Sequence, residues 1–380
     1  MSERVRVMRL WTGIMVVAAV SALTGCSGFF VAPDNGGGGG GGATTGNRAY
    51  VANSASKTIA GFTVGTGTLT AVPNSPVSLG YSPVAAVATP TNSFLYVAGP
   101  GAIYVYTINA DGSLTSSSAG AAVAILNVAA LDVSPDGSWL FGLDTTTTVI
   151  DQFQINKSTG ALTSVAATPY TVTNAVVAPK DIRVAPNGAL VFAALGTGGD
   201  VVFTFNTTTG ALVSSQVLAP PSVTSSDNGL AIDSTTTYLY IARSGTGGGL
   251  AVFGIGAAGA LKSVTGSPFA TGTGPNAVVL DSTGKYVYVA NRTDGNISGF
   301  TIGTAGALTT LTGSPYASGT QVTSLGIDKS GKYLLAAAFG GSPDLSMYSF
   351  DAVTAGKLIL ATSTATGTGT TGAIAVALTH

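Results

Sequence analysis

Short runs of apolar and β-branched residues recur along the chain from about residue 48, and turn-forming residues interrupt them at a regular spacing. Seven of these runs share one pattern, usually with an aromatic residue in second place: 49–52, 95–98, 140–143, 191–194, 239–242, 287–290 and 334–337. Runs of this length and composition, bounded by glycine, asparagine, serine and aspartate, predict β-strands. We therefore expect seven equivalent strands.

A second marker, glycine followed two positions later by leucine, keeps the same spacing. It begins at Gly67, Gly112, Gly160, Gly210, Gly259, Gly306 and Gly356, at intervals of 45 to 50 residues. Such a period is typical of the four-stranded blades of β-propellers. The glycine predicts a positive φ in a tight hairpin, and the leucine predicts the start of the next strand, facing the core.

One complete repeat predicts four antiparallel strands. The first covers 276–281, the second 285–291 and the third 297–302, and the fourth starts at Leu308. Small residues dominate the first strands, for example at 84–87 and 277–280, and they suit the crowded axis of a propeller. The sequence therefore predicts an all-β fold, a single seven-bladed β-propeller with four antiparallel strands per blade over residues 48–380.

The register of the repeats predicts how the ring closes. The first repeat begins with the strand at 49–52 and has no first strand of its own, whereas residues 373–379 read as an additional first strand. We expect this C-terminal strand to pair with the first blade. Such pairing covers strand edges that would otherwise favour aggregation.

The composition supports the all-β reading and narrows the function. Charged residues make up only 8 % of the chain, against about 25 % in an average soluble domain, and there are 53 glycines. The few lysines and arginines are scattered through the repeats and form no basic stripe of the kind that nucleic-acid binding needs. We therefore expect no nucleic-acid partner.

The N-terminus has the pattern of an export signal for residues 1–25. Arg4, Arg6 and Arg9 precede an apolar stretch, 14–23, that is too short to span a bilayer permanently. The stretch ends in Leu23-Thr24-Gly25-Cys26, which resembles the bacterial lipobox, and Cys26 is the only cysteine. We expect Cys26 to carry lipid; the alternative is an ordinary signal peptide followed by an incidental cysteine.

Residues 26–47 are predicted to form a lipidated tether. They show no periodic pattern and include seven successive glycines, 36–42, which is typical of a flexible coil. The expected location is the cell envelope, with the membrane contacted through the N-terminal lipid. By resemblance to sorting rules in Gram-negative bacteria, Ser27 favours the outer membrane.

The repeat also resembles a known family. The segment Tyr288-Val289-Ala290-Asn291-Arg292, followed by Asn296, Phe300 and Gly306-Ala307-Leu308, is similar to repeats of the lactonase-like seven-bladed propellers. That family includes propeller-type 6-phosphogluconolactonases and fungal carboxymuconate-cyclising enzymes, and the Tyr-Val-Thr-Asn repeats of surface proteins look similar. The resemblance covers residues 48–380 and implies a fold more strongly than a reaction.

The resemblance implies polar side chains, including arginine and histidine, in the central funnel. Arg292 matches the arginine of the family's Asn-Arg pair, Arg243 falls near a similar strand end one blade earlier, and Lys180 and Arg183 flank a segment where relatives often carry histidine. Asp181 in that segment is the candidate base. The departures are that the only histidine is His380 and that no glutamate follows residue 25.

Four aspartates, Asp132, Asp233, Asp281 and Asp328, are expected after first strands, before the turns that follow. They offer two interpretations: calcium ligands, or side chains that bind the backbone of their own turns. We favour the second because each belongs to a different blade. No metal or cofactor is predicted, since the glycine-rich strings precede strands and lack the helix that a pyrophosphate needs.

Two functions remain open. The first is a non-catalytic binding or scaffold module, a monomer, that holds a protein, glycan or small molecule of unknown identity. The second is a lactone-hydrolysing enzyme, in which an arginine would stabilise the oxyanion and Asp181 would activate water. The missing histidine and glutamate favour the first, and the family resemblance is the main support for the second.

Overall fold

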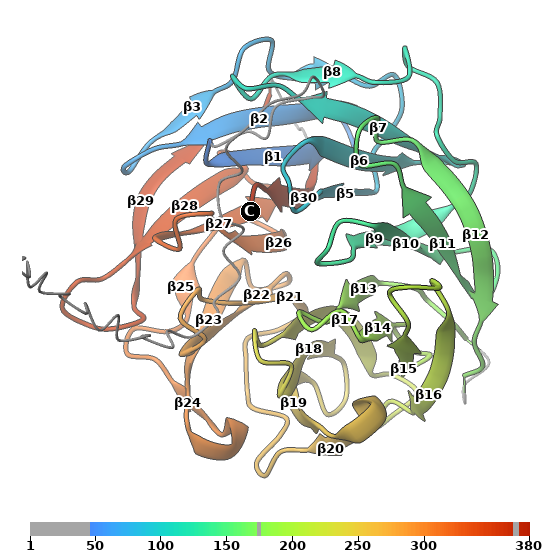
Figure 1. The fold of residues 1–380 in the computed structure, drawn as a ribbon. Coiled ribbons are helices and arrows are strands. Elements are labelled where there is room, and N and C mark those ends of the chain that lie inside the picture. Colours follow the sequence, from blue (N-terminus) through green and yellow to red (C-terminus); the bar gives the residue numbers. More distant parts are fainter. Residues whose placement is uncertain (1–45, 173–175, 368–371) are drawn as a thin grey trace, which may run out of the picture. The chain divides into compact units, whose positions relative to one another are not determined.

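The computed structural model describes residues 46–172, 176–367 and 372–380, and within them it forms seven antiparallel sheets arranged around an axis (Figure 1). Blades 1 to 7 are these sheets in chain order. The predicted leader, Cys26 and the predicted tether as far as residue 45 lie outside the described residues. The expected seven-bladed β-propeller with four strands per blade is confirmed.

Each blade has a first, second, third and outer strand, counted from the axis. The first strands of blades 1 to 7 are β30 (Ala373–Leu378), β5 (Ala85–Ala88), β9 (Val128–Val133), β13 (Asp181–Val184), β17 (Ser226–Ile232), β21 (Pro275–Leu280) and β26 (Val322–Ile327). The second strands are β1 (Arg48–Asn53), β6 (Phe94–Gly99), β10 (Trp139–Asp144), β14 (Leu190–Ala194), β18 (Tyr238–Ser244), β22 (Tyr286–Asn291) and β27 (Tyr333–Ala338).

The third strands are β2 (Thr58–Val64), β7 (Ala102–Ile108), β11 (Val149–Ile155), β15 (Asp200–Phe205), β19 (Gly249–Ile255), β23 (Asn296–Ile302) and β28 (Leu345–Phe350). The outer strands are β3 (Leu69–Ala71), β8 (Leu114–Ser116), β12 (Leu162–Pro169), β16 (Leu212–Leu218), β20 (Leu261–Ser263), β24 (Leu308–Thr310) and β29 (Leu358–Thr364). Two short strands, β4 (Val77–Ser78) and β25 (Tyr316–Ala317), pair with β2 and β23, and two single 3₁₀ turns are η1 (Ala257–Gly259) and η2 (Thr304–Gly306).

The marker glycines act as predicted. All seven have φ between +70° and +88°, and each leucine two positions later begins an outer strand. The turn also contacts the preceding blade: the Trp139 indole donates to the carbonyl of Thr207 at 3.0 Å, and a Cβ on Gly210 would lie 2.3 Å from the Trp139 ring. Glycine is therefore needed both for the backbone and for the packing of the neighbouring aromatic ring.

The apolar core lies between neighbouring blades. Seven clusters of buried residues each combine side chains from two adjacent sheets, for example Phe141 of blade 3 with Ile182 of blade 4. The fully buried aromatic residues of the second strands, such as Tyr50 and Tyr288, are central to this packing. The aromatic second place of the repeat is thus a core position.

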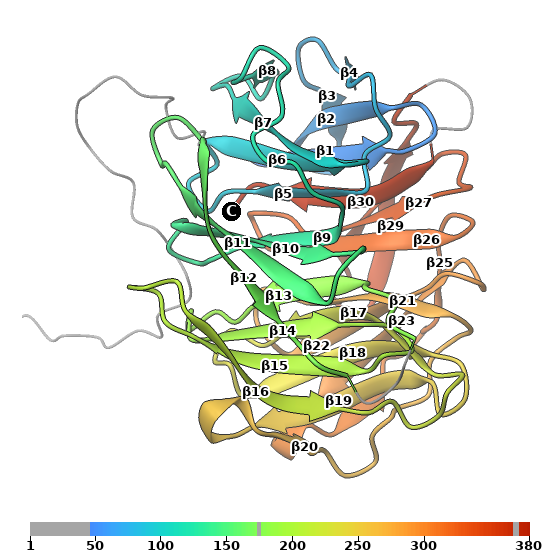
Figure 2. The ribbon, with the colours of Figure 1, turned by 90° about the vertical axis from the view of Figure 1, so that its right-hand side faces the viewer.

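The ring closes through its C-terminal strand, as expected. In β30, Ala377 pairs with Tyr50 and Leu378 with Ala49 of β1, so blade 1 combines the two ends of the described chain. Thr379 accepts a hydrogen bond from the Arg48 amide at 2.8 Å. Figures 1 and 2 both show β30 beside β5 at the inner edge of the ring, where the two strands are in contact.

The antiparallel order gives the ring two faces. The turns between first and second strands lie on one side, which we call the turn face, and the links from second to third strands lie on the other, the loop face. Asn47 belongs to the turn face, because its amide donates to Asp328 in the first turn of blade 7 at 2.6 Å. Among the described residues there is no helix of the length and apolarity that a membrane crossing requires.

Candidate functional site

Blades 3 and 4 carry charged residues on their first strands, at a level where the other blades carry none. In the strand register, Asp132 faces Phe141 and Arg183 faces Phe192. The equivalent first-strand places in blades 1, 2, 5, 6 and 7 hold Ala377, Val87, Ala231, Val279 and Gly326. At this level the innermost strands are therefore apolar or small except in these two neighbouring blades. We call Asp132, Asp181 and Arg183 the axial cluster.

Backbone contacts hold the axial cluster in place across two blade junctions. Asp132 accepts a hydrogen bond from the amide of Val184 at 2.7 Å, which links blade 3 to blade 4. Asp181 accepts one from the amide of Leu230 at 2.9 Å, which links blade 4 to blade 5. Nε of Arg183 lies 3.4 Å from Asp181 Oδ2 and 3.4 Å from the carbonyl of Leu230.

Burial and the neighbouring charges shift the pKa values of the carboxyl groups in the axial cluster. Burial raises the pKa of Asp132 to about 6, and the charge of Arg183 opposes that rise. Burial likewise raises the pKa of Asp181, again opposed by Arg183. Asp132 thus changes its charge nearer to neutral pH than an ordinary aspartate does.

The side chain of Arg183 reaches solvent. Its side chain is 44 % exposed although it belongs to an innermost strand. Among the described residues its polar contacts all involve Nε, which leaves the two terminal nitrogens free to bind a carboxylate or phosphate in a bidentate manner. Lys180, directly before β13, is also exposed and adds a second positive charge.

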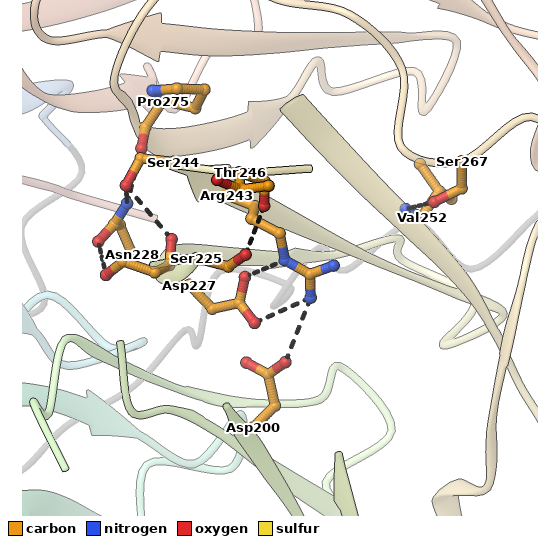
Figure 3. Close-up of polar contacts among 11 residues, drawn as sticks. Asp200, Ser225, Asp227, Asn228, Arg243, Ser244, Thr246, Val252, Ser267 and Pro275 are labelled. Carbon is orange, nitrogen blue, oxygen red and sulfur yellow. Dashed lines mark hydrogen bonds and ion pairs between the residues drawn. The ribbon is translucent and has the colours of Figure 1, made fainter. Parts of the chain in front are cut away.

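Arg243 is not part of the axial cluster. It is only 6 % exposed and its Nε and Nη2 donate to the two carboxylate oxygens of Asp227 at 2.5 and 2.9 Å. Figure 3 shows the carboxyl groups of Asp227 and Asp200 both directed at the guanidinium of Arg243, and Oδ2 of Asp200 lies 3.9 Å from Nη2. We call Asp200, Asp227 and Arg243 the junction cluster, because they join blade 4 to blade 5.

Arg292 is separate from both clusters. It lies on the link after β22, is exposed, and donates from Nη2 to Gln321 at 3.3 Å. In the strand register Arg243 faces Asp227 as Asn291 faces Pro275, so Arg243 is equivalent to Asn291 and not to Arg292. A difference of one residue in strand register therefore places Arg243 inside the junction and leaves Arg292 in solvent. Of the five predicted residues, Asp181 and Arg183 come together, with Lys180 beside them in the chain.

The prediction for Asp132 was wrong, whereas the other three turn aspartates behave as expected. Asp233, Asp281 and Asp328 each accept hydrogen bonds from amides of their own turns. Asp132 lies inside β9, and Ser134 takes the turn position. Counting back from the turn glycine reveals the difference, since Asp281 stands three residues before Gly284 but Asp132 stands five before Gly137.

Two clefts lie away from the axial cluster. One of about 520 Å³ on the loop face is lined by Thr145 to Thr148, Val177 and Pro179, and one of about 360 Å³ on the turn face lies between blades 4 and 5. Neither lining includes a charged residue. Within the part of the chain that the structure describes, no three histidine, cysteine or acidic side chains gather as metal ligands would.

Comparisons with known proteins agree with this architecture. The family model named Lactonase, a seven-bladed β-propeller, matches residues 116–225 and 230–374. A search of curated proteins finds no match.

Among solved structures, a candidate 6-phosphogluconolactonase of Bacteroides uniformis is 17 % identical over 88 % of this chain and 99 % of its own, with a TM-score of 0.69. A candidate 6-phosphogluconolactonase of Bacteroides fragilis is 18 % identical over 88 % of this chain and 98 % of its own, with a TM-score of 0.69. The periplasmic gluconolactonase PpgL of Pseudomonas aeruginosa is 21 % identical over 68 % of this chain and 78 % of its own, with a TM-score of 0.57. At these identities the likeness concerns the fold. Because the family model covers more than half of the chain, the chain belongs to the lactonase family of seven-bladed β-propellers.

Proposed function

We propose that this protein is a lipid-anchored binding module of the cell envelope, which holds a small polyhydroxylated acid at the axis of its propeller. The observation that carries the proposal is the partly exposed side chain of Arg183, which lies beside Asp181 and interacts electrostatically with Asp132 on the innermost strands. A carboxylate or phosphate of the ligand would bind Arg183, and ligand hydroxyls would donate to Asp132 and Asp181. Several similar structures carry gluconolactonase descriptions, which suggests sugar acids as the first ligands to test.

The proposed anchor is supported by the Leu23-Thr24-Gly25-Cys26 segment. Metabolic labelling with a fatty-acid analogue tests the anchor. We expect label in the native chain and none in Cys26→Ser; equal labelling of both would contradict it.

Calorimetric titration tests the binding site. We expect gluconate or 6-phosphogluconate to bind the purified protein and glucose, which lacks the acid group, not to bind. Arg183→Gln should weaken binding at least about tenfold, because a charge-assisted bidentate contact is lost. Arg292→Gln is the matched control, since Arg292 lies on the link after β22 and should leave binding unchanged. No binding to any acid, or equal loss in both variants, would refute the axial site.

Hydrolysis of a sugar lactone is the second candidate function. One observation favours it, namely that burial raises the pKa of Asp132 to about 6, which suits a general base near neutral pH. Asp132 would take a proton from water as the water attacks the lactone carbonyl, and Arg183 would stabilise the oxyanion. Saturable gluconolactone hydrolysis that is lost in Asp132→Asn would replace the binding-module proposal with this one.

A further inference from the structure

Asp200 occupies a core position that is aliphatic in all six other blades. In each blade this position lies on the third strand. It pairs with the last residue of the repeated four-residue run on the second strand, which is alanine or leucine, as Asp200 pairs with Ala194. The equivalent residues are Ile59, Ile103, Ile150, Leu250, Ile297 and Leu345, each with no exposed surface. Asp200 itself is only 2 % exposed. A carboxyl group has thus replaced a branched aliphatic side chain without leaving the core.

The carboxyl group of Asp200 has no hydrogen-bond donor. Neither of its oxygens accepts a hydrogen bond from any residue that the structure describes. Its nearest cation is Arg243, whose Nη2 is 3.9 Å away and already donates to Asp227. A buried and unsatisfied carboxylate is costly, so the neutral form is favoured here.

The charge balance of the junction cluster depends on one proton. Arg243 is the only cation and it faces two carboxyl groups, so the cluster is neutral when Asp200 is protonated and carries one net negative charge when it is not. Burial first, and then the charge of Asp227, raise the pKa of Asp200 well above its usual value, while Arg243 opposes the rise.

Among the described residues, no other titratable group faces Asp200 from the elements packed around it. The neighbouring strands β14 and β16 and the link 195–199 contain none, and β17 and β18 contribute Asp227 and Arg243. Lys180 is exposed and approaches the link at Gly196, where a Cβ would lie 3.3 Å from its Cε.

Two glycine-rich links form the backbone around the junction cluster. The links 195–199 and 244–248 are rich in glycine, and Gly199, Gly245 and Gly247 all have positive φ. Blades 4 and 5 are joined here by two backbone hydrogen bonds between Gly196 and Asp227, each 3.2 Å long. The link 195–199 is closely packed, since a Cβ on Gly199 would lie 2.0 Å from the carbonyl oxygen of Leu218. Water therefore reaches an ionised Asp200 only when this packing opens locally.

We propose that the junction cluster is a proton-operated latch between blades 4 and 5, closed when Asp200 is neutral and loosened when it ionises. In the closed state Arg243 is engaged fully by Asp227. After ionisation the proton passes to solvent, Arg243 is shared between two carboxylates, and water enters along the link 195–199. Because the folded state holds the proton more tightly than the unfolded state, the junction is most stable at low pH and loses stability as the pH rises.

Hydrogen exchange measured on the mature full-length protein between pH 5 and 8 tests the latch. After correction for the intrinsic pH dependence of exchange, protection of peptides covering 195–200 and 225–230 should fall at least about tenfold as the pH rises. Peptides covering the equivalent blade 6 segments, 291–297 and 274–278, serve as the internal reference and should stay constant.

Two variants separate the latch from a purely structural role. Asp200→Leu installs the residue that the equivalent position of blade 5 carries, and Asp200→Asn keeps the shape without the titration. Both should show a flat profile at 195–200, and the asparagine variant decides the matter if the leucine variant fails to fold. Two results would overturn the proposal. One is that protection at 195–200 in the unmodified protein depends on pH no more than protection in blade 6 does, and the other is that the pH-dependent loss of protection persists in either variant. The measurement needs no ligand and is therefore independent of the proposed function.

Discussion

The junction between blades 4 and 5 and the junction between blades 5 and 6 share one backbone arrangement but differ in chemistry. At the junction between blades 5 and 6 the three equivalent places hold Pro275, Asn291 and Leu250, whereas in the junction cluster they hold Asp227, Arg243 and Asp200. Asn291 donates to Oδ1 of Asn296 at 2.7 Å and to the hydroxyl of Ser298 at 2.9 Å, while its own Oδ1 has no partner among the described residues. None of the three side chains at this place is ionisable, whereas the junction cluster keeps a charge balance that one proton alters.

The comparison teaches that the propeller repeat tolerates buried charge only as a compensated group. Asp227 takes a place held by Pro275 in blade 6 and Val322 in blade 7, and Arg243 neutralises it with two hydrogen bonds. Only the third member, Asp200, lacks a donor. Three predictions follow this difference from the largest effect to the smallest.

The largest effect is expected when the uncompensated charge is moved to blade 6. Ile297→Asp should lower the free energy of unfolding by at least about 4 kcal/mol, because the new carboxyl group replaces a fully buried side chain and has no arginine beside it. Urea denaturation monitored by circular dichroism measures the loss. Ile297→Val is the control, with an expected cost of about 1 kcal/mol. A loss in Ile297→Asp no larger than in the control would break the comparison.

A slightly smaller loss is expected when the compensating cation is removed. Arg243→Ala should cost about 3 to 5 kcal/mol, because it leaves Asp227 buried without its partner. The triple variant Asp200→Leu, Asp227→Val, Arg243→Leu, which uses residues found at the same places in other blades, should recover most of that loss in the same urea experiment. If the triple variant is no more stable than Arg243→Ala, the three charged residues stabilise the fold by more than neutralising one another.

The smallest effect is expected at the other arginine. Arg292→Ala should change the free energy of unfolding by less than about 0.5 kcal/mol, since Arg292 is exposed and its side chain makes one long contact, to Gln321. Thermal unfolding of the two alanine variants side by side measures the contrast. Equal destabilisation by Arg292→Ala and Arg243→Ala would mean that the one-residue offset between them does not matter.

Much of the fold could be predicted because each blade repeats the same local rules. The positive φ at Gly67 and Gly356, the outer strands that start two residues later, and the closing strand at 373–378 all follow from periodic positions in the chain. The surroundings of charged residues could not be predicted as well, because the sequence does not distinguish the last residue of a strand from the first residue of the link that follows. The repeat pattern makes Arg243 and Arg292 look similar and predicts a turn at Asp132, although a count from Gly137 places Asp132 in β9.

The sequence by itself determined the seven blades and their four strands, because hydrogen-bonded hairpins and glycine turns depend on residues that are close in the chain. It also determined how the ring closes, because the first repeat lacks a first strand and the C-terminal segment supplies an additional one. Only the tertiary structure decided which charges face each other. Asp132 meets β13, and Asp200 meets Arg243, across junctions between separate blades. Such contacts depend on the packing of whole sheets, whose faces are set by register, and a shift of one residue exchanges a buried partner for solvent.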